Sequence, residues 1–258
     1  MVAFKDRTGE RFISNEGCEF VIVEYKNAKN VLIEFQDEHK FRKQVTYADC
    51  KSKEITNPFH PKVVGHGYIG VGEHKIRKNG KPTKAYRYWC SMLERGLSEE
   101  FKKNFPTYKD VTVNSECYCF QDFGEWFDNN YYEIEGETMC LDKDILIKGN
   151  KEYSFDRMIF VPHRINSLFT KSDIARGDYP IGVGYKKETG RYQAYCSVLI
   201  DDKKKLKHIG YYDTPEQAFQ AYKQFKEAYI KQVADEYKDK IPQRLYDAMY
   251  NWVVEEDD

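Results

Sequence analysis

The sequence predicts an α+β protein built from several small domains, and three observations support this prediction. Strand-type residues dominate the first 72 residues. A short apolar strand, a turn, a second strand and a helix follow one another between residues 141 and 166. Three strands precede one helix between residues 178 and 237. A chain of 258 residues with 41% hydrophobic residues is long enough for two or three domains with cores of their own. We therefore expect domains at 1–72, 85–177 and 178–258, with a linker at 73–84.

The N-terminal block, residues 1–72, is rich in β-branched and aromatic residues. Strands are expected at Cys18 to Tyr25, Val31 to Phe35 and Phe41 to Tyr47, with shorter extended pieces at Arg11 to Ser14 and Tyr68 to Val71. Five short strands in about 70 residues favour a small SH3-like β-barrel. The block is either a module that docks nucleic acid or protein, or a spacer domain without chemistry of its own.

The segment at 73–84 is basic and contains residues that break regular structure. From His74 to Lys84 it holds five Lys or Arg residues and no acidic residue. A flexible basic segment gains affinity for phosphates by releasing counterions, without preference for base sequence. Lys75, Arg77 and Lys78 are therefore candidate DNA contacts, and a plain solvated linker is the alternative.

Charge is distributed in blocks along a chain whose net charge is only −1. Residues 113–142 contain eight acidic residues and no basic residue. This run is either a solvated face that points away from any bound duplex or a mimic of phosphates toward a basic partner. We expect helices at Ala85 to Glu94 and around Phe120 to Asn130, with a short strand at Val111 to Val113 between them.

The N-terminus has no apolar segment of the kind found in signal peptides, and no run approaches the roughly 20 apolar residues of a membrane span. The seven cysteines are odd in number and contain no C-x-x-C pair, which favours free thiols in a reducing compartment over disulfides or structural zinc. We expect a cytoplasmic protein with no membrane partner.

The central segment, Leu141 to Asn166, is where a metal site is expected. A short strand ends in Asp142 and Asp144, and Lys148-Gly149-Asn150 supplies a tight turn. A second strand is expected at Met158 to Val161, and a helix after Pro162 with His163, Arg164 and Asn166 in its first turn. A carboxylate on the strand and an amide on the helix are oxygen ligands of the type that a hard divalent cation prefers.

Three separated signatures in this region resemble those of phage HNH-like nucleases, which have the His-Me finger or ββα-metal fold. They are LDKDILIKGNKEYSFDRMIFVP from Leu141, YWCSMLER from Tyr88 and FQDFGEW from Phe120. Together they cover residues 86–169 in the order found in that family. The resemblance implies an HNH-like ββα domain at 85–177 that holds one Mg²⁺ or Mn²⁺ and cuts DNA.

Carried over residue by residue, the resemblance implies Asp142 and Asn166 as metal ligands. Lys143 stands where the family has its general-base His, and a lysine with an ordinary pKa of about 10.4 is a poor base at neutral pH. Asp144 and His163 are the other candidate catalytic groups. Gly96 and Asn114 stand where the family has cysteines.

The C-terminal module is predicted to be a three-stranded antiparallel sheet with one helix. Strands are expected at Ile181 to Lys187, Arg191 to Ile200 and Leu206 to Tyr212, with turns at 186–190 and 201–204. Thr214 as N-cap and Pro215 at the first position begin the helix. Its apolar face is expected to be Ala218, Tyr222, Phe225 and Tyr229. A further short helix and a frayed acidic end are expected after Tyr237.

This module is similar to the plant ethylene-responsive-factor (Apetala-two) DNA-binding domain. The resemblance rests on Gly182-Val183, Tyr192-x-Ala194, Ile209-Gly210-Tyr211, Thr214-x-Glu216-x-Ala218 and Ala221-Tyr222. It implies that the sheet face opposite the helix lies in the DNA major groove. Gly184 stands where that family has an Arg. By alternation, Tyr192, Ala194, Cys196 and Val198 should face the helix and Ser197 should face out. The candidate DNA contacts here are Lys186, Lys187, Arg191, Gln193, Tyr195, Lys205, Lys207 and His208.

Two functional hypotheses follow. The first is a phage-type DNA-binding nuclease related to free-standing homing endonucleases, which nicks or cleaves double-stranded DNA with Mg²⁺ or Mn²⁺ in the cytoplasm of a bacterial host. The second is a catalytically degenerate descendant without a cofactor. Such a protein would act as a DNA-binding regulator or as a phage inhibitor of a host defence protein.

Overall fold

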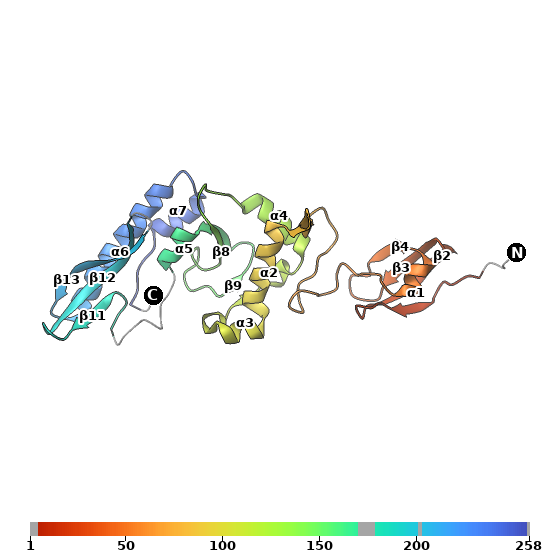
Figure 1. Ribbon diagram of the computed structural model, residues 1–258, viewed down its shortest axis with the longest axis horizontal. Coiled ribbons are helices and arrows are strands. Elements are labelled where there is room, and N and C mark those ends of the chain that lie inside the picture. The colour runs from red at the N-terminus through yellow and green to blue at the C-terminus, as the bar shows by residue number, and fades with distance from the viewer. Residues whose placement is uncertain (1–4, 170–178, 201–202, 257–258) are drawn as a thin grey trace. The chain divides into compact units, whose positions relative to one another are not determined.

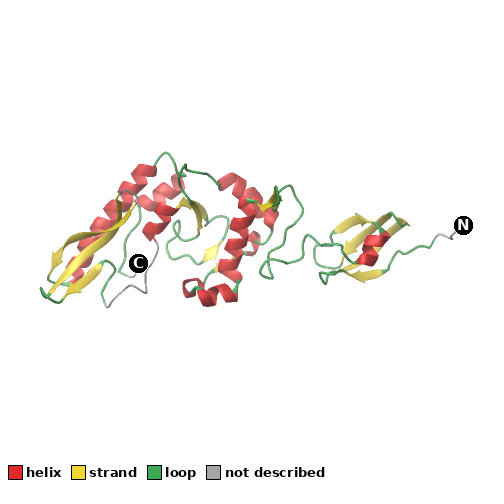
Figure 2. Cartoon of the chain, viewed as in Figure 1, coloured by secondary structure: helices red, strands yellow, loops and turns green. Residues whose placement is uncertain are grey.

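The structure is a computed structural model that describes residues 5–169, 179–200 and 203–256. The chain divides into two compact units, coloured along the chain in Figure 1 and by element type in Figure 2. Unit 1 comprises Met1–Asn129 and Glu152–Phe155, and unit 2 comprises Asn130–Lys151 and Asp156–Asp258. Helices and several small sheets occur in both units, so the predicted α+β class is confirmed.

Unit 1 begins with a four-stranded antiparallel sheet followed by a short helix. The strands pair in chain order, and the elements are β1 (Arg11–Ile13), β2 (Glu19–Asn27), β3 (Asn30–Phe35), β4 (Arg42–Val45) and α1 (Tyr47–Ser52). Phe20, Ile22, Val31, Ile33 and Phe35 alternate along β2 and β3 and form a buried core. This alternation is the period of two that half-buried strands require.

Two details of this sheet differ from the prediction. Tyr68 to Val71, expected as a fifth strand, forms only an isolated bridge from Tyr68 to Cys119. The strand expected to reach Tyr47 ends at Val45, because Thr46 is the N-cap of α1 and its side chain accepts a hydrogen bond from the Asp49 N–H. Asp49 in turn accepts from the Thr46 N–H, so the two residues form a capping box.

The predicted linker at 73–84 contains a β-hairpin made of β5 (Arg77–Lys78) and β6 (Lys81–Pro82). Asn79 and Gly80 form its turn, with φ of 52° and 75°. Asn-Gly with positive φ at both positions is the preferred two-residue hairpin turn. The sequence therefore contained a hairpin signal that the prediction of a structureless linker did not use.

The remainder of unit 1 is mainly helical. Its elements are α2 (Lys84–Leu97), α3 (Glu99–Asn104), η1 (Pro106–Tyr108), β7 (Thr112–Val113), η2 (Ser115–Cys117), α4 (Phe120–Asn130) and β9 (Glu152–Tyr153). Trp89 of α2 is buried, and its Nε1 donates to the Cys117 carbonyl at 2.8 Å. The strands β7 and β9 pair in parallel. The predicted helices at 85–94 and 120–130 and the strand near 112 are confirmed, and α3 was not predicted.

Unit 2 begins with two antiparallel strands and a helix. These are β8 (Met139–Asp142), β10 (Ile159–Pro162) and α5 (His163–Phe169), and Ile159 pairs with Asp142. The expected two strands and helix are therefore present. The expected turn is present as well, because Gly149 has a φ of 81° and the Asn150 N–H donates to the Ile147 carbonyl at 3.0 Å.

The C-terminal part of unit 2 is a three-stranded antiparallel sheet with a long helix. Its elements are β11 (Val183–Lys186), β12 (Arg191–Ile200), β13 (Lys203–Tyr212), α6 (Pro215–Tyr237) and α7 (Gln243–Tyr250). Thr214 is the N-cap of α6, and its hydroxyl accepts from the Gln217 N–H at 3.3 Å, as predicted. Figure 1 shows α6 lying along the sheet. The second predicted turn, at 201–204, lies partly outside the described residues.

One hydrophobic core runs through unit 2. It joins Val161 and Ile165 of the β8–β10–α5 segment to Ala194, Tyr222 and Leu245 of the C-terminal part. The predicted boundary at residue 177 therefore does not divide the apolar side chains of this unit into separate cores.

The end of the chain packs on unit 2 as far as the structure describes it. Val254 is buried, its N–H donates to Glu227, and its carbonyl accepts from Lys223. Lys148 forms an ion pair with Glu255 at 2.9 Å. The Glu256 carbonyl accepts from the Ile181 N–H at 3.3 Å, so the expected frayed end is not found as far as Glu256, and Asp257 and Asp258 lie outside the described residues. Within the described residues, no helix is both long and apolar enough to cross a bilayer.

Candidate functional site

Asp142, the predicted metal ligand, ends strand β8 and caps the loop that follows it. Its Oδ1 accepts hydrogen bonds from the backbone N–H groups of Asp144, at 2.9 Å, and Ile145, at 2.8 Å. Aspartate side chains commonly stabilise turns in this way by accepting from N–H groups two or three residues further on. One carboxylate oxygen of the predicted ligand therefore already has a structural role.

Burial raises the pKa of Asp142 to about 6, and repulsion by Asp144 adds to this effect. The two backbone hydrogen bonds oppose it, because they stabilise the ionised form. An ionised Asp142 is therefore costly in this position. A divalent cation at the site would relieve that cost, and so would protonation.

Lys143, the residue at the family's general-base position, is buried and points into the same loop. Its Nζ donates to Asp144 Oδ2 at 3.0 Å, and its carbonyl accepts from Asn150 Nδ2 at 2.7 Å. The carboxylate of Asp144, the second one of the predicted site, is therefore paired with the Lys143 ammonium group. A lysine in such a pair acts as a donor, not as a base that takes a proton from water.

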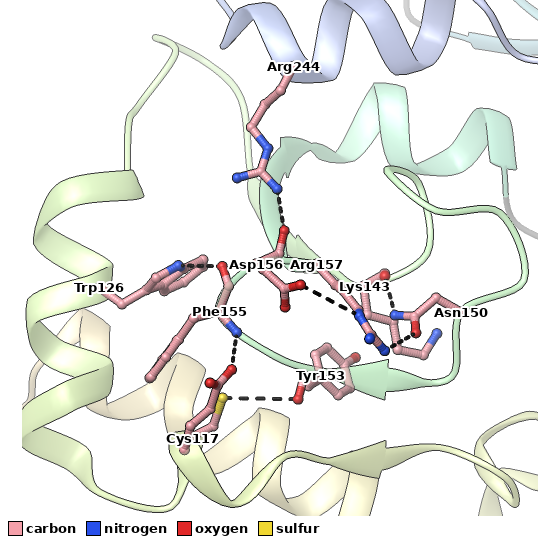
Figure 3. A network of polar contacts seen from close by, with 10 residues as sticks. Cys117, Trp126, Lys143, Asn150, Tyr153, Phe155, Asp156, Arg157 and Arg244 are labelled. Carbon is pink, nitrogen blue, oxygen red and sulfur yellow. Dashed lines mark hydrogen bonds and ion pairs between the residues drawn. The ribbon is translucent and has the colours of Figure 1, made fainter.

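Sequence reasoning missed two residues that meet in this loop, Asn150 and Arg157 (Figure 3). Asn150 bonds the Lys143 carbonyl, and Arg157 Nη1 lies 3.5 Å from Asn150 Oδ1. Arg244 of α7 donates to the Asp156 carbonyl at 2.6 Å, which ties the end of the loop to the C-terminal helix. The Gly149 turn signalled a reversal of the chain, but nothing in the sequence signalled that its Asn would bond the backbone seven residues earlier.

His163 and Asn166, the predicted helix residues, lie in the first turn of α5. His163 is exposed, and its Nδ1 lies 3.7 Å from the Cys140 thiol on the neighbouring strand. Asn166 is half-buried on the same helix. Among the described residues, the His163 ring contacts a thiol and not an orienting carboxylate of the kind that general-base histidines use.

The residues of this loop do not fit a divalent cation well. Oxygen-rich sites need several carboxylate or carbonyl oxygens turned toward one point. Here Asp142 Oδ1 caps the turn and Asp144 is paired with Lys143. Within the part of the chain that the structure describes, no three His, Cys, Asp or Glu side chains gather as a metal site would require. We therefore derive no step that passes through a metal ion.

The second candidate site is the face of the β11–β12–β13 sheet that lies away from α6, named here the outer face. Ala194, Cys196 and Val198 are buried toward α6, and Tyr192 packs against the same core. The predicted alternation of β12 is thereby confirmed. Residues paired directly across antiparallel strands share a face. The pairs on the outer face are Lys186 with Arg191, Gln193 with Tyr211, and Tyr195 with His208.

The outer-face side chains form a cationic and aromatic surface. Lys186 Nζ lies 5.5 Å from the centre of the Tyr211 ring and donates to its hydroxyl at 3.3 Å. The His208 ring lies 4.6 Å from the Tyr211 ring, so a cation from β11 and two rings from β13 lie next to one another. Arg191 is exposed, and its Nε pairs with Asp213 at 3.1 Å. The described outer-face residues of the three strands include no carboxylate.

Gly184 allows two side chains of β12 to lie close to the β11 backbone on this surface. A Cβ added at Gly184 would lie 3.2 Å from Gln193 Nε2 and 3.2 Å from Tyr195 Cε1. Both side chains therefore lie over the glycine. An arginine at this position, as in the plant family, would displace them.

Lys205 and Lys207 are not on the outer face. They pair with Val198 and Cys196, so they lie on the α6 side of the sheet, although both are exposed. His208 stays on the outer face because a bulge shifts the register between Ala194 and Tyr195. The prediction placed Lys205, Lys207 and His208 together, and the register separates the two lysines from the histidine. Lys187 follows β11 directly and is exposed.

The three basic residues predicted in the linker lie on or beside the β5–β6 hairpin of unit 1. Lys75, Arg77 and Lys78 are all exposed. The Lys75 carbonyl accepts from the Thr83 hydroxyl at 2.9 Å, and Arg77 donates to the Gly80 carbonyl at 3.0 Å. These two hydrogen bonds and the pairing of β5 with β6 stabilise the backbone that carries the basic side chains.

Comparisons of this chain with protein-family models, with curated proteins and with solved structures found no match. Function is therefore inferred from the side chains of the two units. Of the two candidate sites, the 142–157 loop pairs Lys143 with Asp144, and the outer face presents most of its charges to solvent.

Proposed function

We propose that this protein binds double-stranded DNA through the outer face of the β11–β12–β13 sheet. The observation that carries the proposal is the surface formed by Lys186, Arg191, His208 and Tyr211, with Asp213 as the acidic neighbour at its edge. Lys and Arg bind phosphates, and Arg and Gln can make bidentate contacts to base edges. Three strands spaced about 4.8 Å apart span about 10 Å, which matches a major groove about 12 Å wide.

The β5–β6 hairpin supports a second, non-specific contact with the phosphate backbone. Its exposed lysines and arginine carry positive charge, and residues 75–84 contain no aromatic residue. The amide of Asn79 lies in the turn between the two strands. Such a contact adds affinity through counterion release and depends strongly on salt. The hairpin and the outer face would then differ in function: the first contacts phosphates, and the second also discriminates between sequences.

We further propose that the β8–β10–α5 segment descends from an HNH-like finger and that the N-terminal sheet is SH3-like. The order of two strands and a helix, with Asp142 at the end of the first strand, supports the first proposal. The pairing of Lys143 with Asp144 supports a descendant that no longer cleaves DNA. Metal-dependent nicking is the second candidate function, and the order of these three elements favours it.

Duplex binding is tested by fluorescence anisotropy with labelled random-sequence DNA over a series of salt concentrations. We expect saturable binding with a log–log salt slope of about −0.9 for each phosphate neutralised. The matched control for outer-face variants is Lys231→Ala with Lys238→Ala, two lysines on or just after α6 whose ammonium groups lie over Tyr250 and Tyr246. Absence of binding at low salt, or equal loss in the control, would overturn the proposal.

Cleavage is tested separately by incubating supercoiled plasmid with Mg²⁺, with Mn²⁺ or with EDTA. We expect no conversion to nicked or linear DNA under any condition. Asp142→Asn is the appropriate comparison because, unlike Ala, it keeps an oxygen for the two backbone N–H groups. Nicking that needs metal and disappears in Asp142→Asn would establish the second candidate function in place of the non-cleaving one.

A further inference from the structure

Unit 1 contains a hollow that the proposed DNA contacts do not use. Its volume is about 650 Å³. It is lined by residues of the turn between β1 and β2 and of the turn between β3 and β4, and by Asn57, Phe59, His60, Pro61, Gly65, His66, Tyr68 and Tyr118. All of these belong to unit 1. A hollow of this volume falls within the range of sites for small ligands or for a few residues of a peptide.

Aromatic rings form much of the lining. The His39 and Phe59 rings are stacked, with centres 4.2 Å apart and planes 17° apart. Tyr68 lies 5.5 Å from His39 and 5.8 Å from Phe59, and the His66 ring lies 5.4 Å from Tyr118. Phe59, Tyr68 and Tyr118 are only half-buried, so part of each ring remains accessible.

Carboxylates line the same hollow, and Asp37 is the most firmly held of them. Its Oδ1 accepts from the backbone N–H groups of His39 and Lys40, both at 3.1 Å, and its Oδ2 accepts from Asn57 Nδ2. Asn57 is buried, with 2% of its surface exposed. Among the contacts of the described residues, these donors are neutral, so the negative charge of Asp37 has no cation as partner there.

Glu38 and Glu19 add to the negative charge of the lining. The Glu38 side chain is 89% exposed, and its Oε1 lies 3.6 Å from His39 Nε2. Glu19 pairs with Arg11 at 2.7 Å, so its charge is already balanced. The lining residues include no Lys or Arg. The hollow therefore combines electron-rich ring faces with two carboxylates that lack a Lys or Arg partner in the described contacts.

We propose that this hollow binds an arginine side chain of a partner protein. A guanidinium is planar, stacks on aromatic rings and donates to carboxylates in a fork. Both surfaces are present, because the stacked pair of His39 and Phe59 adjoins Asp37 and Glu38. A phosphate or a carboxylate would meet like charge here. The volume exceeds that of one guanidinium group and leaves room for the residues on either side of the arginine.

This site stands apart from the proposed DNA surfaces in both charge and chemistry. The outer face and the β5–β6 hairpin are basic and suit an anionic partner, whereas the hollow is acidic and aromatic. One chain therefore carries sites of opposite charge, one for a duplex and one for an arginine-bearing protein. The inference does not depend on whether the DNA proposal is correct.

The first test uses the full chain, isotopically labelled, in a nuclear magnetic resonance titration with N-acetyl-arginine amide. N-acetyl-citrulline amide is the matched control, because it has the same shape without the charge. We expect saturable shifts for His39, Phe59, Tyr68 and Tyr118 with the arginine probe, and none with citrulline. Equal shifts with both probes would overturn the proposal. So would shifts spread over acidic surfaces elsewhere, or tighter binding of N-acetyl-lysine amide.

The second test uses variants of the lining, with folding checked by the unchanged resonances of the rest of unit 1. Glu38→Gln removes an exposed charge and is expected to weaken arginine binding by up to about fivefold. Phe59→Leu removes the stacking ring and should weaken it by about fivefold or more. Glu24→Gln, an exposed β2 carboxylate that pairs with Lys26, is the control and should change nothing. Unchanged affinity in both lining variants, or binding of thymidine monophosphate at the same residues, would refute the assignment.

Discussion

Two regions of the molecule use charged side chains in opposite ways. In the 142–157 loop, Lys143 pairs with Asp144, Asn150 bonds the Lys143 carbonyl, and Asp142 caps the turn. On the outer face of the sheet, the cations and rings meet solvent, and Asp213 is the acidic partner at the edge. The loop uses its polar groups to hold its own backbone in shape. The outer face leaves its groups available for a ligand, and this difference places the proposed function on the sheet.

The largest expected effect concerns the charge of Asp142 in the loop. The pKa of this group is about 6 in the folded protein, against an ordinary value of 3.8. A raised carboxyl pKa means that stability is greatest when the group is protonated and falls as pH rises from about 4 to about 6. Asp142→Asn should therefore raise the free energy of unfolding by up to about 3 kcal/mol at pH 7 and by little at pH 4.

Denaturant unfolding of unit 2, followed at both pH values, measures this difference. Asp239→Asn is the control, because Asp239 is an exposed carboxylate of the same unit. The control should not gain stability as pH rises. A gain of equal size at pH 4 and pH 7 in Asp142→Asn would show that burial of charge is not its cause.

The next effect concerns the outer face. Lys186→Ala with Arg191→Ala removes two cations that we expect to contact phosphates. Duplex affinity at low salt should fall by about 30-fold, and the magnitude of the log–log salt slope should fall by about 2 × 0.9. Anisotropy titrations at several salt concentrations measure both quantities. A loss of affinity without any change in slope would mean that these residues act on the fold of the sheet and not on DNA.

A smaller effect is expected for Asn150→Ala in the loop. The change removes the hydrogen bond to the Lys143 carbonyl and should lower the free energy of unfolding by about 1 kcal/mol. Asn129→Ala, at an exposed position near the end of α4, is the control. Duplex affinity should stay unchanged in both variants. A large loss of duplex affinity in Asn150→Ala would contradict the proposal that the loop serves the fold and the outer face binds DNA.

Local rules were enough to predict much of the fold. Thr214 and Pro215 mark the start of α6, and Ala194, Cys196 and Val198 alternate as a half-buried strand must. The features that were missed depend on distant partners. Tyr68 forms a β-bridge with Cys119, and the Asn150 side chain donates to the Lys143 carbonyl. Neither spacing nor propensity contains such contacts, because each depends on where a loop returns in space.

The candidate sites show the same limit. The sequence indicated which residues could bind DNA or metal, but not whether the Lys143 ammonium would face a carboxylate. It also could not give the bulge beside Tyr195, which moves His208 to the outer face and leaves Lys207 on the other. The Asn79-Gly80 turn is different, since its signal was present in the sequence and was overlooked.

The smallest expected effect is the one that tests the register most directly. Lys205→Ala with Lys207→Ala removes the same amount of charge as the double change at Lys186 and Arg191. Because the two lysines pair with Val198 and Cys196 on the α6 side, duplex affinity should fall by no more than about threefold, through long-range attraction alone. The log–log salt slope should differ from the wild-type slope by less than the change expected for about half of one phosphate contact. If this variant loses as much affinity as the outer-face variant, total charge and not the outer face determines binding.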